Sequence, residues 1–209
     1  MIFMDLTYHT EKSMSTPKNS LVLVHQNIGG IISKIEDLQE FFCNGKIYPH
    51  ILCFSEYHMS RDDVHFFGIE NYVLWSNFSR STFQKGGVCI YIRNDVFFNY
   101  FDFSKYGKEN TLEICAVQIV TTEERMIVMC EYRSPSGDFN HFLRLLDMAL
   151  LSLNKPSIEI PICGDFNVDN LLSCHHKQKL SLLLGAYNMM HTVGISNLKP
   201  SHRVNIFST

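Results

Sequence analysis

The sequence has no pair of cysteines spaced as C-x-x-C, although it has seven cysteines, at positions 43, 53, 89, 115, 130, 163 and 174. An odd count without that spacing disfavours both a disulfide framework and a structural zinc site. Several of the seven lie in apolar runs such as Ile51–Phe54 and Val88–Ile92. This placement predicts buried free thiols in a reducing compartment, and hence a nuclear or cytoplasmic protein that is not secreted.

Long hydrophobic runs are also absent. No stretch approaches the roughly 18 apolar residues of a membrane-spanning helix, so we expect no membrane partner. The apolar patch at the start of the chain is short and is interrupted by Asp5. It is therefore not typical of a secretory signal peptide.

Charge of either sign is scarce, and the formal net charge is only -3 at pH 7. Such a chain has no broad basic field, so a nucleic-acid partner would have to bind in a local groove. The hydrophobic fraction of 45% is nevertheless ample for a packed core. With 209 residues, the sequence predicts one sizeable domain over residues 20–209 and a polar, flexible N-terminal tail over residues 1–19.

The hydrophobic pattern from Leu21 onward is typical of an α/β protein. Three helices are expected from apolar residues at helical spacing, over residues 31–45, from a cap at Ser136 or Asp138 to Leu153, and over residues 175–187. Strands are expected at residues 21–25, 51–54, 72–75, 88–92, 112–119, 126–131 and 159–163. Because strands outnumber helices and the helices lie between strand groups, a pair of mixed sheets flanked by helices is favoured.

One segment carries the clearest chemical signal. The apolar residues Ile160–Cys163 end in Gly164 and are followed by Asp165 and Asn167. Side chains alternate faces along a strand, so the acid and the amide are expected to point the same way. Together they could hold a water molecule against a phosphate. The alternative is an ordinary turn after a strand, because Gly, Asp and Asn favour turns.

Other polar residues follow the ends of expected strands, where α/β enzymes place their chemistry. Asn27 precedes two glycines, Glu56 directly follows a buried strand, and Tyr132 and Arg133 end another strand. A phenol and a guanidinium suit a phosphate. Each feature also has a plain structural explanation, namely a turn, a surface acid or an aromatic residue at a strand rim. Gly86 and Gly87 are expected to serve only a tight turn.

The order of five motifs decides between these readings. Together the motifs resemble those of the endonuclease/exonuclease/phosphatase superfamily, which has the DNase I-like fold. They are QN at 26–27, FSE at 54–56, KGGVCIYI at 85–92, EYRSPSGDF at 131–139 and GDFNVD at 164–169. More narrowly, the chain is similar to the apurinic-type endonuclease domain of non-LTR retrotransposons. The resemblance implies an α/β four-layer sandwich of two mixed β-sheets flanked by helices, with the last strands incomplete.

The resemblance also implies roles for individual residues. In this family a divalent ion, Mg²⁺ or Mn²⁺, activates the scissile phosphate of DNA. His58 is expected to pack near the site, since this ion prefers oxygen ligands. Matching the motifs position by position, the resemblance implies that Glu56 binds the metal and that Asn27 orients it. Asp165 would position or deprotonate the attacking water, and Asn167 would donate to a phosphoryl oxygen. Tyr132 would lie by the phosphate or leaving oxygen, and Arg133 would bind the phosphate.

The sequence departs from the family near its last residues. Pro200–Arg203 resembles the family's Pro-Thr-Arg segment, but Val204 stands where an acid is expected, and no Ser-Asp-His motif is present. Loss of a general acid or base costs about 10²- to 10⁴-fold in rate. The expectation is a truncated DNA-nicking endonuclease domain with impaired activity, whose intact element carries a fused reverse transcriptase. The alternatives are a non-catalytic nucleic-acid-binding remnant, or a phosphatase or phosphodiesterase of the same fold acting on a lipid head group.

Overall fold

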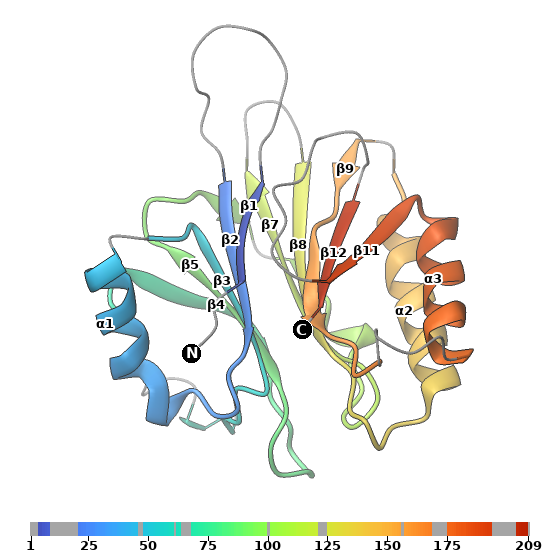
Figure 1. Cartoon of the computed structure of the whole chain (residues 1–209), viewed down its shortest axis with the longest axis horizontal. Coiled ribbons are helices and arrows are strands. Elements are labelled where there is room, and N and C mark those ends of the chain that lie inside the picture. Colours follow the sequence, from blue (N-terminus) through green and yellow to red (C-terminus); the bar gives the residue numbers. More distant parts are fainter. Residues whose placement is uncertain are drawn as a thin grey trace, which may run out of the picture.

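A computed structural model of the chain describes residues 4–8, 21–45, 48–60, 62–63, 68–99, 101–120, 125–155, 157–168, 175–193 and 204–208. Two β-sheets pack face to face, and helices cover the outer face of each (Figure 1). This is the four-layer arrangement that the motif order implied. None of the helices in these ranges is both long enough and apolar enough to cross a bilayer.

The first sheet has five strands in the order β1-β2-β3-β5-β4. Strands β2 and β3 are parallel, and the other neighbours are antiparallel. Helix α1 (Ile35–Gly45), which begins with the 3-10 turn η1 (Ile32–Lys34), covers the outer face of this sheet. The strands are β1 (Met4–Tyr8), β2 (Leu21–Asn27), β3 (Ile51–Ser55), β4 (Tyr72–Phe78) and β5 (Val88–Arg93).

The second sheet has seven strands, in the order β11-β12-β10-β8-β7-β6 with β9 beside β8. Helices α2 (Phe139–Leu153) and α3 (His175–Ala186) cover its outer face, and the 3-10 turn η3 (Ser104–Tyr106) lies before β7 in the chain. The strands are β6 (Phe98–Asn99), β7 (Glu113–Val120), β8 (Arg125–Tyr132), β9 (Ile158–Glu159), β10 (Ile162–Asp165), β11 (Met189–Val193) and β12 (Val204–Ser208).

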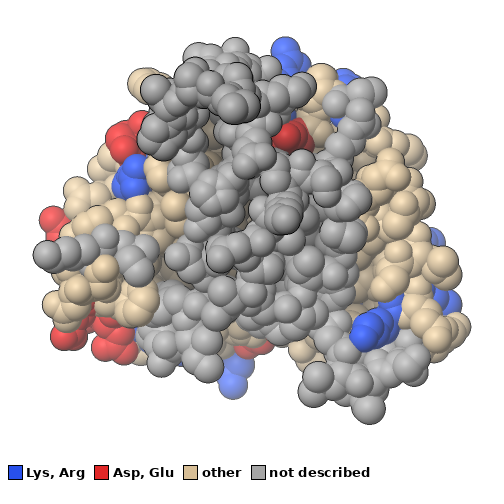
Figure 2. Space-filling view, turned by 45° about the horizontal axis from the view of Figure 1, so that its top comes forward, with Lys and Arg blue, Asp and Glu red and all other residues tan. Residues whose placement is uncertain are grey.

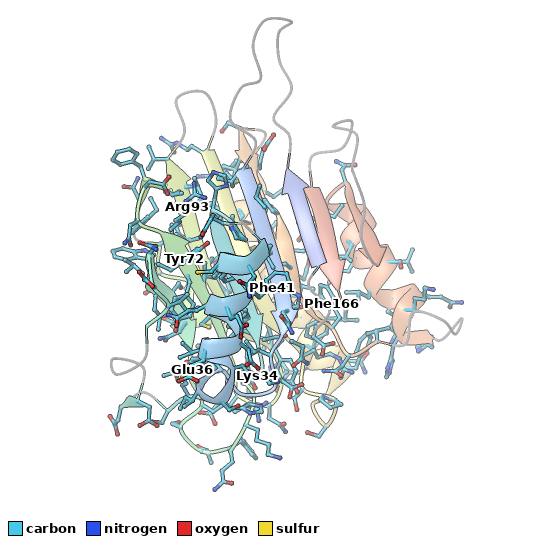
Figure 3. All side chains as sticks on the ribbon, turned by 60° about the vertical axis from the view of Figure 1, so that its left-hand side comes forward. Lys34, Glu36, Phe41, Tyr72, Arg93 and Phe166 are labelled. Carbon is cyan, nitrogen blue, oxygen red and sulfur yellow. The ribbon has the colours of Figure 1, made fainter. Side chains whose placement is uncertain are left out.

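The period of two along each strand divides the core into layers. In β3, Ile51 and Cys53 face the opposite sheet, whereas Leu52 and Phe54 pack beneath α1. All five residues of β3 are buried, which explains why its sequence is a continuous apolar run and does not alternate. Figure 3 looks onto the outer face of the five-stranded sheet, with α1 in front of it.

Two details differ from the sequence expectations. Met4–Tyr8, within the segment expected to be a flexible tail, forms strand β1 and pairs antiparallel with β2. The strand expected over residues 159–163 is split into β9 and β10, because Pro161 has no N–H to donate; its carbonyl instead accepts from the N–H of Met129 at 2.9 Å. The domain boundary near residue 20 stays a prediction.

The topology brings four strand ends together. Strands β2 and β3 are parallel to each other, as are β8 and β10, and the carboxyl ends of all four lie at the lower end of the sandwich in Figure 1. Lys34 and Glu36, labelled in Figure 3, mark the same end, where α1 begins after β2. The residues singled out by sequence all follow or end these four strands.

The register of β10 against β8 requires glycine at position 164, opposite Glu131. A Cβ atom there would overlap the main-chain carbonyl of Glu131. We predict that Gly164→Ala lowers the free energy of unfolding by about 1–3 kcal/mol, as overpacking does. Urea denaturation measures this change.

The matched control is Gly185→Ala in α3, where nothing lies within 4 Å of the added atom. It is expected to raise stability by about 0.5–1 kcal/mol, because alanine favours the helix. Equal effects of the two substitutions would show that the close β8–β10 contact does not constrain the sheet.

Candidate active site

The side chain of Asn27 joins the two sheets at the lower end of the sandwich. Its Nδ2 donates to Oε1 of Glu56 and to Oδ2 of Asp165, at 2.9 Å in each case. Asn27 ends β2, Glu56 follows β3, and Asp165 ends β10 of the other sheet. Because one nitrogen contacts both carboxylates, these lie within two hydrogen-bond lengths of each other. Three residues predicted to share one site are thus in direct contact.

Glu56 reaches this position through an unusual backbone conformation. Its φ is 52°, in the left-handed region that non-glycine residues seldom occupy. The loop after β2 holds it there, because the N–H of Gly30 donates to the carbonyl of Glu56 at 2.8 Å and Ile28 donates to that of Ser55 at 2.9 Å. The Glu56 side chain is 28% exposed, so its carboxylate is anchored and still open to solvent. Strained backbone of this kind is typical of functional sites.

Asp165 is more enclosed, with only 8% of its surface exposed. Its Oδ2 accepts from Asn27, and its Oδ1 accepts from the main-chain N–H of Asn167 at 2.9 Å. Its own carbonyl accepts from the N–H of Arg133 at 3.0 Å. Both carboxylate oxygens therefore have a donor that fixes their direction, as a group that orients a water molecule requires.

Tyr132 lies opposite Asp165 in the pairing of β8 with β10. Burial raises its pKa well above the ordinary value for tyrosine, and the charge of Glu56 and a hydrogen bond with that residue raise it further. The guanidinium of Arg80 lies 5.9 Å from the centre of the Tyr132 ring and acts in the opposite direction. The phenol is therefore held in its neutral form, in which it can donate a hydrogen bond.

Asn167 lies close to Asp165, but not because side chains alternate along a strand, as the sequence analysis expected. Strand β10 ends at Asp165, and Asn167 has a φ of 48° in the turn that follows. Its Nδ2 donates to the carbonyl of Arg133 at 2.7 Å. An amide nitrogen carries two N–H groups, so this contact leaves one of them for another acceptor.

Arg133 differs from the phosphate ligand that the sequence predicted. The residue is 5% exposed, and its guanidinium donates to main-chain carbonyls: to Phe166 and Asn167 at 2.6 Å and to Ser134 at 3.1 Å. Its charge also lies 5.5 Å from the centre of the Phe139 ring. These contacts tie the Arg133 guanidinium to the main chain of the segment after Asp165.

His58 lies at the rim of the site. Its Nε2 is 3.5 Å from Oε2 of Glu56. Burial, together with the charges of Lys85 and Arg80, lowers the pKa of His58 despite the neighbouring Glu56, which favours the neutral imidazole. A Cβ atom added to Gly30 would lie 3.3 Å from the ring, so the glycine gives His58 room.

Sequence reasoning missed two charged residues beneath the site. Arg80 forms an ion pair with the fully buried Glu113, whose other oxygen accepts from the N–H of Gly87 at 2.6 Å. Gly86 and Gly87 both have positive φ, as expected for a tight turn into β5. Glu113 carried a usable signal, since an acid inside the apolar run 112–117 needs a buried partner.

A buried acid next to the site adds no negative charge to it. Glu131 is fully buried, and neither of its carboxylate oxygens has a hydrogen-bond partner among the described residues. Burial raises its pKa well above the ordinary value, and the nearby Asp165 adds to the effect. The Glu131 side chain therefore favours the uncharged acid. Glu56 and Asp165 are the other acidic side chains of the site, at the carboxyl ends of the strands.

The donor set suits a hard divalent cation. Mg²⁺ binds one or two carboxylates and keeps several water molecules. The partly exposed carboxylate of Glu56 and the nearby carboxylate of Asp165 offer oxygen atoms to a metal. The Asn27 amide holds both carboxylates in position without adding charge. These residues therefore fit Mg²⁺ or Mn²⁺.

The charges on the described surface are dispersed. Lys and Arg, like Asp and Glu, form small separate groups on the face shown in Figure 2. A pocket of about 310 Å³ lies away from the site, between the segment 101–106, the start of β8 and the end of α2. Arg125, which lines this pocket, begins β8, whereas the site residue Tyr132 ends that strand, so the pocket is not part of the candidate site.

Comparison with known proteins gives the fold but no close relative. No family model and no curated protein matches the sequence. Among solved structures, the endonuclease domain of TRAS1, a telomere-specific non-LTR retrotransposon, is 13% identical with a TM-score of 0.59 over 79% of this chain and 70% of that one. The AP endonuclease LMAP from Leishmania major is 14% identical, with a TM-score of 0.60 over 79% of this chain and 66% of that one.

TDP2 from D. rerio, complexed with a single-strand DNA product, is 11% identical with a TM-score of 0.54. The match covers 77% of this chain and 63% of TDP2, so the chain spans less than two thirds of that protein. All three are DNase I-like members of the endonuclease/exonuclease/phosphatase group. The chain has the same mixed α/β fold with two mixed sheets, and the predicted fold class is confirmed.

The contacts of Arg133 predict a structural effect when it is replaced. Arg133→Met keeps the stem but removes the donors to the carbonyls of Phe166 and Asn167. Because hydrogen bonds from charged groups contribute about 1.5–3 kcal/mol each, we expect the loss of these two to cost about 3 kcal/mol or more in urea denaturation.

The control is Arg144→Met on the exposed side of α2, which is expected to change stability by less than about 0.5 kcal/mol. If Arg133→Met changes stability as little as Arg144→Met does, the Arg133 guanidinium does not hold the segment after Asp165. The sequence prediction that Arg133 binds the substrate phosphate would then be favoured.

Proposed function

We propose that this chain hydrolyses phosphodiester bonds in DNA, using a divalent metal ion at the open end of strands β2, β3, β8 and β10. The observation that carries the proposal is the contact of Asn27 with both Glu56 and Asp165. Two carboxylates and an amide from three strands meet there, at the carboxyl ends where α/β proteins bind ligands. The DNase I-like fold supports the same reading.

Glu56 is the proposed metal ligand, because its carboxylate is both anchored by Asn27 and open to solvent. A bound Mg²⁺ or Mn²⁺ would polarise the phosphoryl oxygens and neutralise the charge that develops there. The side-chain amide of Asn27 keeps Glu56 directed toward the space it shares with Asp165. Removal of the Glu56 carboxylate should therefore weaken metal binding more than it weakens the fold.

Asp165 is proposed to position the attacking water and to accept its proton. Donors at both of its oxygens fix the direction of the carboxylate. Such orientation is what a general base needs, since proton transfer requires hydrogen-bond geometry with the reacting group.

Tyr132 and Asn167 are proposed to act on the phosphate. The neutral phenol, whose one O–H hydrogen-bonds Glu56 in this structure, would donate to the phosphate or the leaving oxygen once Glu56 binds the metal, and the second N–H of Asn167 can donate to a phosphoryl oxygen. Fixed donors placed where negative charge develops lower the barrier without reorganisation during the reaction. Arg133 contributes by holding Asn167, not by touching the substrate.

The finer proposal is DNA nicking by a retrotransposon endonuclease, with a fused reverse transcriptase in the intact element. The five ordered motifs support it, and one similar structure is the endonuclease domain of a telomere-specific non-LTR retrotransposon. The small net charge favours recognition through a local groove over bulk attraction to the phosphate backbone.

A second candidate function is nucleic-acid binding without catalysis. It is favoured by Val204, which stands where the resembled family carries an acid. Valine supplies neither a proton nor a ligand, so this position cannot assist the reaction. The two functions differ in whether Glu56 and Asp165 matter to the outcome.

Plasmid nicking tests the catalytic proposal. With Mg²⁺ present, Asp165→Asn is expected to reduce the nicking rate by about 10²- to 10⁴-fold, as loss of a general base does, and Glu56→Gln is expected to reduce it through weaker metal binding. Glu36→Gln, an exposed acid of α1, serves as the control and should leave the rate unchanged. Nicking that is equally fast in all four proteins would mean that the activity does not come from this site.

Binding of labelled single- and double-stranded DNA separates the second candidate. If the chain only binds DNA, affinity should persist in Glu56→Gln and Asp165→Asn, should not need Mg²⁺, and should fall with rising salt. Nicking by the wild type that both substitutions abolish would exclude this candidate.

A further inference from the structure

Three cysteines from the two sheets meet in the centre of the sandwich. Cys53 lies on β3, Cys130 on β8 and Cys163 on β10, and all three are fully buried. Their sulfur atoms all lie within 4.8 Å of one another. Among the described residues, this is the one group of three or more potential ligand side chains gathered so closely.

The register of the strands explains the gathering. Cys163 is paired with Cys130 across β10 and β8, and Cys53 is paired with His25 across β3 and β2. The sheets pack face to face, so the two pairs meet across the gap between them. Each of these four residues lies two positions before the last residue of its strand. Because side chains two positions apart point to the same face of a sheet, the cluster is the layer directly beneath the candidate active site.

His25, paired with Cys53 across β2 and β3, is a candidate fourth ligand, but its ring nitrogens lie outside the 4.8 Å group of sulfur atoms and the ring must turn toward them to bind a shared ion. Its side chain is 1% exposed, and its Nε2 is 3.2 Å from Oγ of Ser55. The other ring nitrogen, Nδ1, is buried and has no hydrogen-bond partner among the described residues. His25 is near enough to Cys163 for the charges of the two groups to influence each other. An unpartnered buried nitrogen is costly and calls for an explanation such as a missing ion.

We propose that Cys53, Cys130 and Cys163 bind a zinc ion, with the imidazole of His25 as the fourth ligand. Zinc prefers four nitrogen and sulfur ligands in a tetrahedron, with Zn–S bonds of about 2.3 Å. Sulfur atoms around such an ion lie roughly 3.8 Å apart by that geometry, so the observed cluster needs only a small contraction. The three thiols release their protons to solvent when they bind, and the imidazole binds in its neutral form.

A disulfide does not account for the cluster as well. It would use only two of the three thiols and would leave the buried Nδ1 of His25 without a partner among the described residues. Four-coordinate zinc uses all four groups and connects both sheets. Cys89 provides the contrast, since it is equally buried but packs on the other face of the first sheet, beneath α1.

The site reverses the expectation drawn from cysteine spacing. The ligands stand far apart in the sequence, at 25, 53, 130 and 163, so no short-range pattern reveals them. Because the site is closed to solvent, the ion should enter as the chain folds and exchange slowly afterwards. The proposal is independent of phosphodiester hydrolysis, since none of the four ligands faces the substrate.

The test uses the full, untagged chain purified with and without added zinc under reducing conditions. We expect about one zinc per chain by elemental mass spectrometry. Refolding with Co²⁺ in place of zinc should give an intense thiolate-to-cobalt band and the visible bands of a tetrahedral ion. Cys130→Ser and Cys163→Ser should each weaken metal affinity at least tenfold, and Cys89→Ser should not. His25→Ala should change the visible cobalt bands.

Asp165→Asn separates this ion from any cation at the candidate active site, and it should retain zinc. Zinc lost in Asp165→Asn but kept in Cys130→Ser would overturn the proposal. A reduced wild-type chain that folds without zinc and gives no thiolate-to-cobalt band would also overturn it. The zinc content and cobalt spectrum of the wild-type chain therefore test the proposal even if a cysteine variant fails to fold. A disulfide within the cluster, detected by the mass of the alkylated chain, would count against it equally.

Discussion

The hydrogen bonds from the Asn27 amide to Glu56 and Asp165 are the contact on which the site depends. Each carboxylate belongs to a different sheet, and two like charges so close together repel each other. A neutral donor between them offsets part of this repulsion and fixes the distance across the gap. An acid at position 27 would add a third negative charge, whereas an apolar residue would remove the donor that the two carboxylates share.

The surroundings of the site maintain this geometry at some conformational cost. Glu56 and Asn167 both have positive φ, which is unfavourable for residues with side chains. Buried contacts on either side hold them there: the loop after β2 binds the backbone of Glu56, and Arg133 donates to the carbonyl of Asn167. The buried pair of Arg80 and Glu113 supports the turn that leads into β5. Charged groups thus serve as internal supports as well as candidate reactive groups.

The sequence predicted the parts of this arrangement that depend on local pattern. Strand periodicity and turn residues placed Asn27, Glu56 and Asp165 at strand ends, and motif order placed those ends in one fold. Asp138 was one of two proposed caps of α2, and its side chain does accept from the N–H of His141, at 2.7 Å. The features that the sequence did not predict depend on contacts between distant residues. Examples are the burial of Arg133, the pairing of Met4–Tyr8 with β2, and the meeting of the three cysteines.

The central claim is that Asn27 lies at a shared cation site of Glu56 and Asp165. Nuclear magnetic resonance of the chain with ¹⁵N-labelled asparagine tests it most directly, because bound Mn²⁺ broadens signals only from nearby nuclei. The side-chain signals of Asn27 are expected to broaden at less than one equivalent of Mn²⁺, while those of Asn154, at the far end of α2, are expected to stay sharp. A sharp Asn27 signal at an Mn²⁺ concentration that broadens Asn154 would contradict the account.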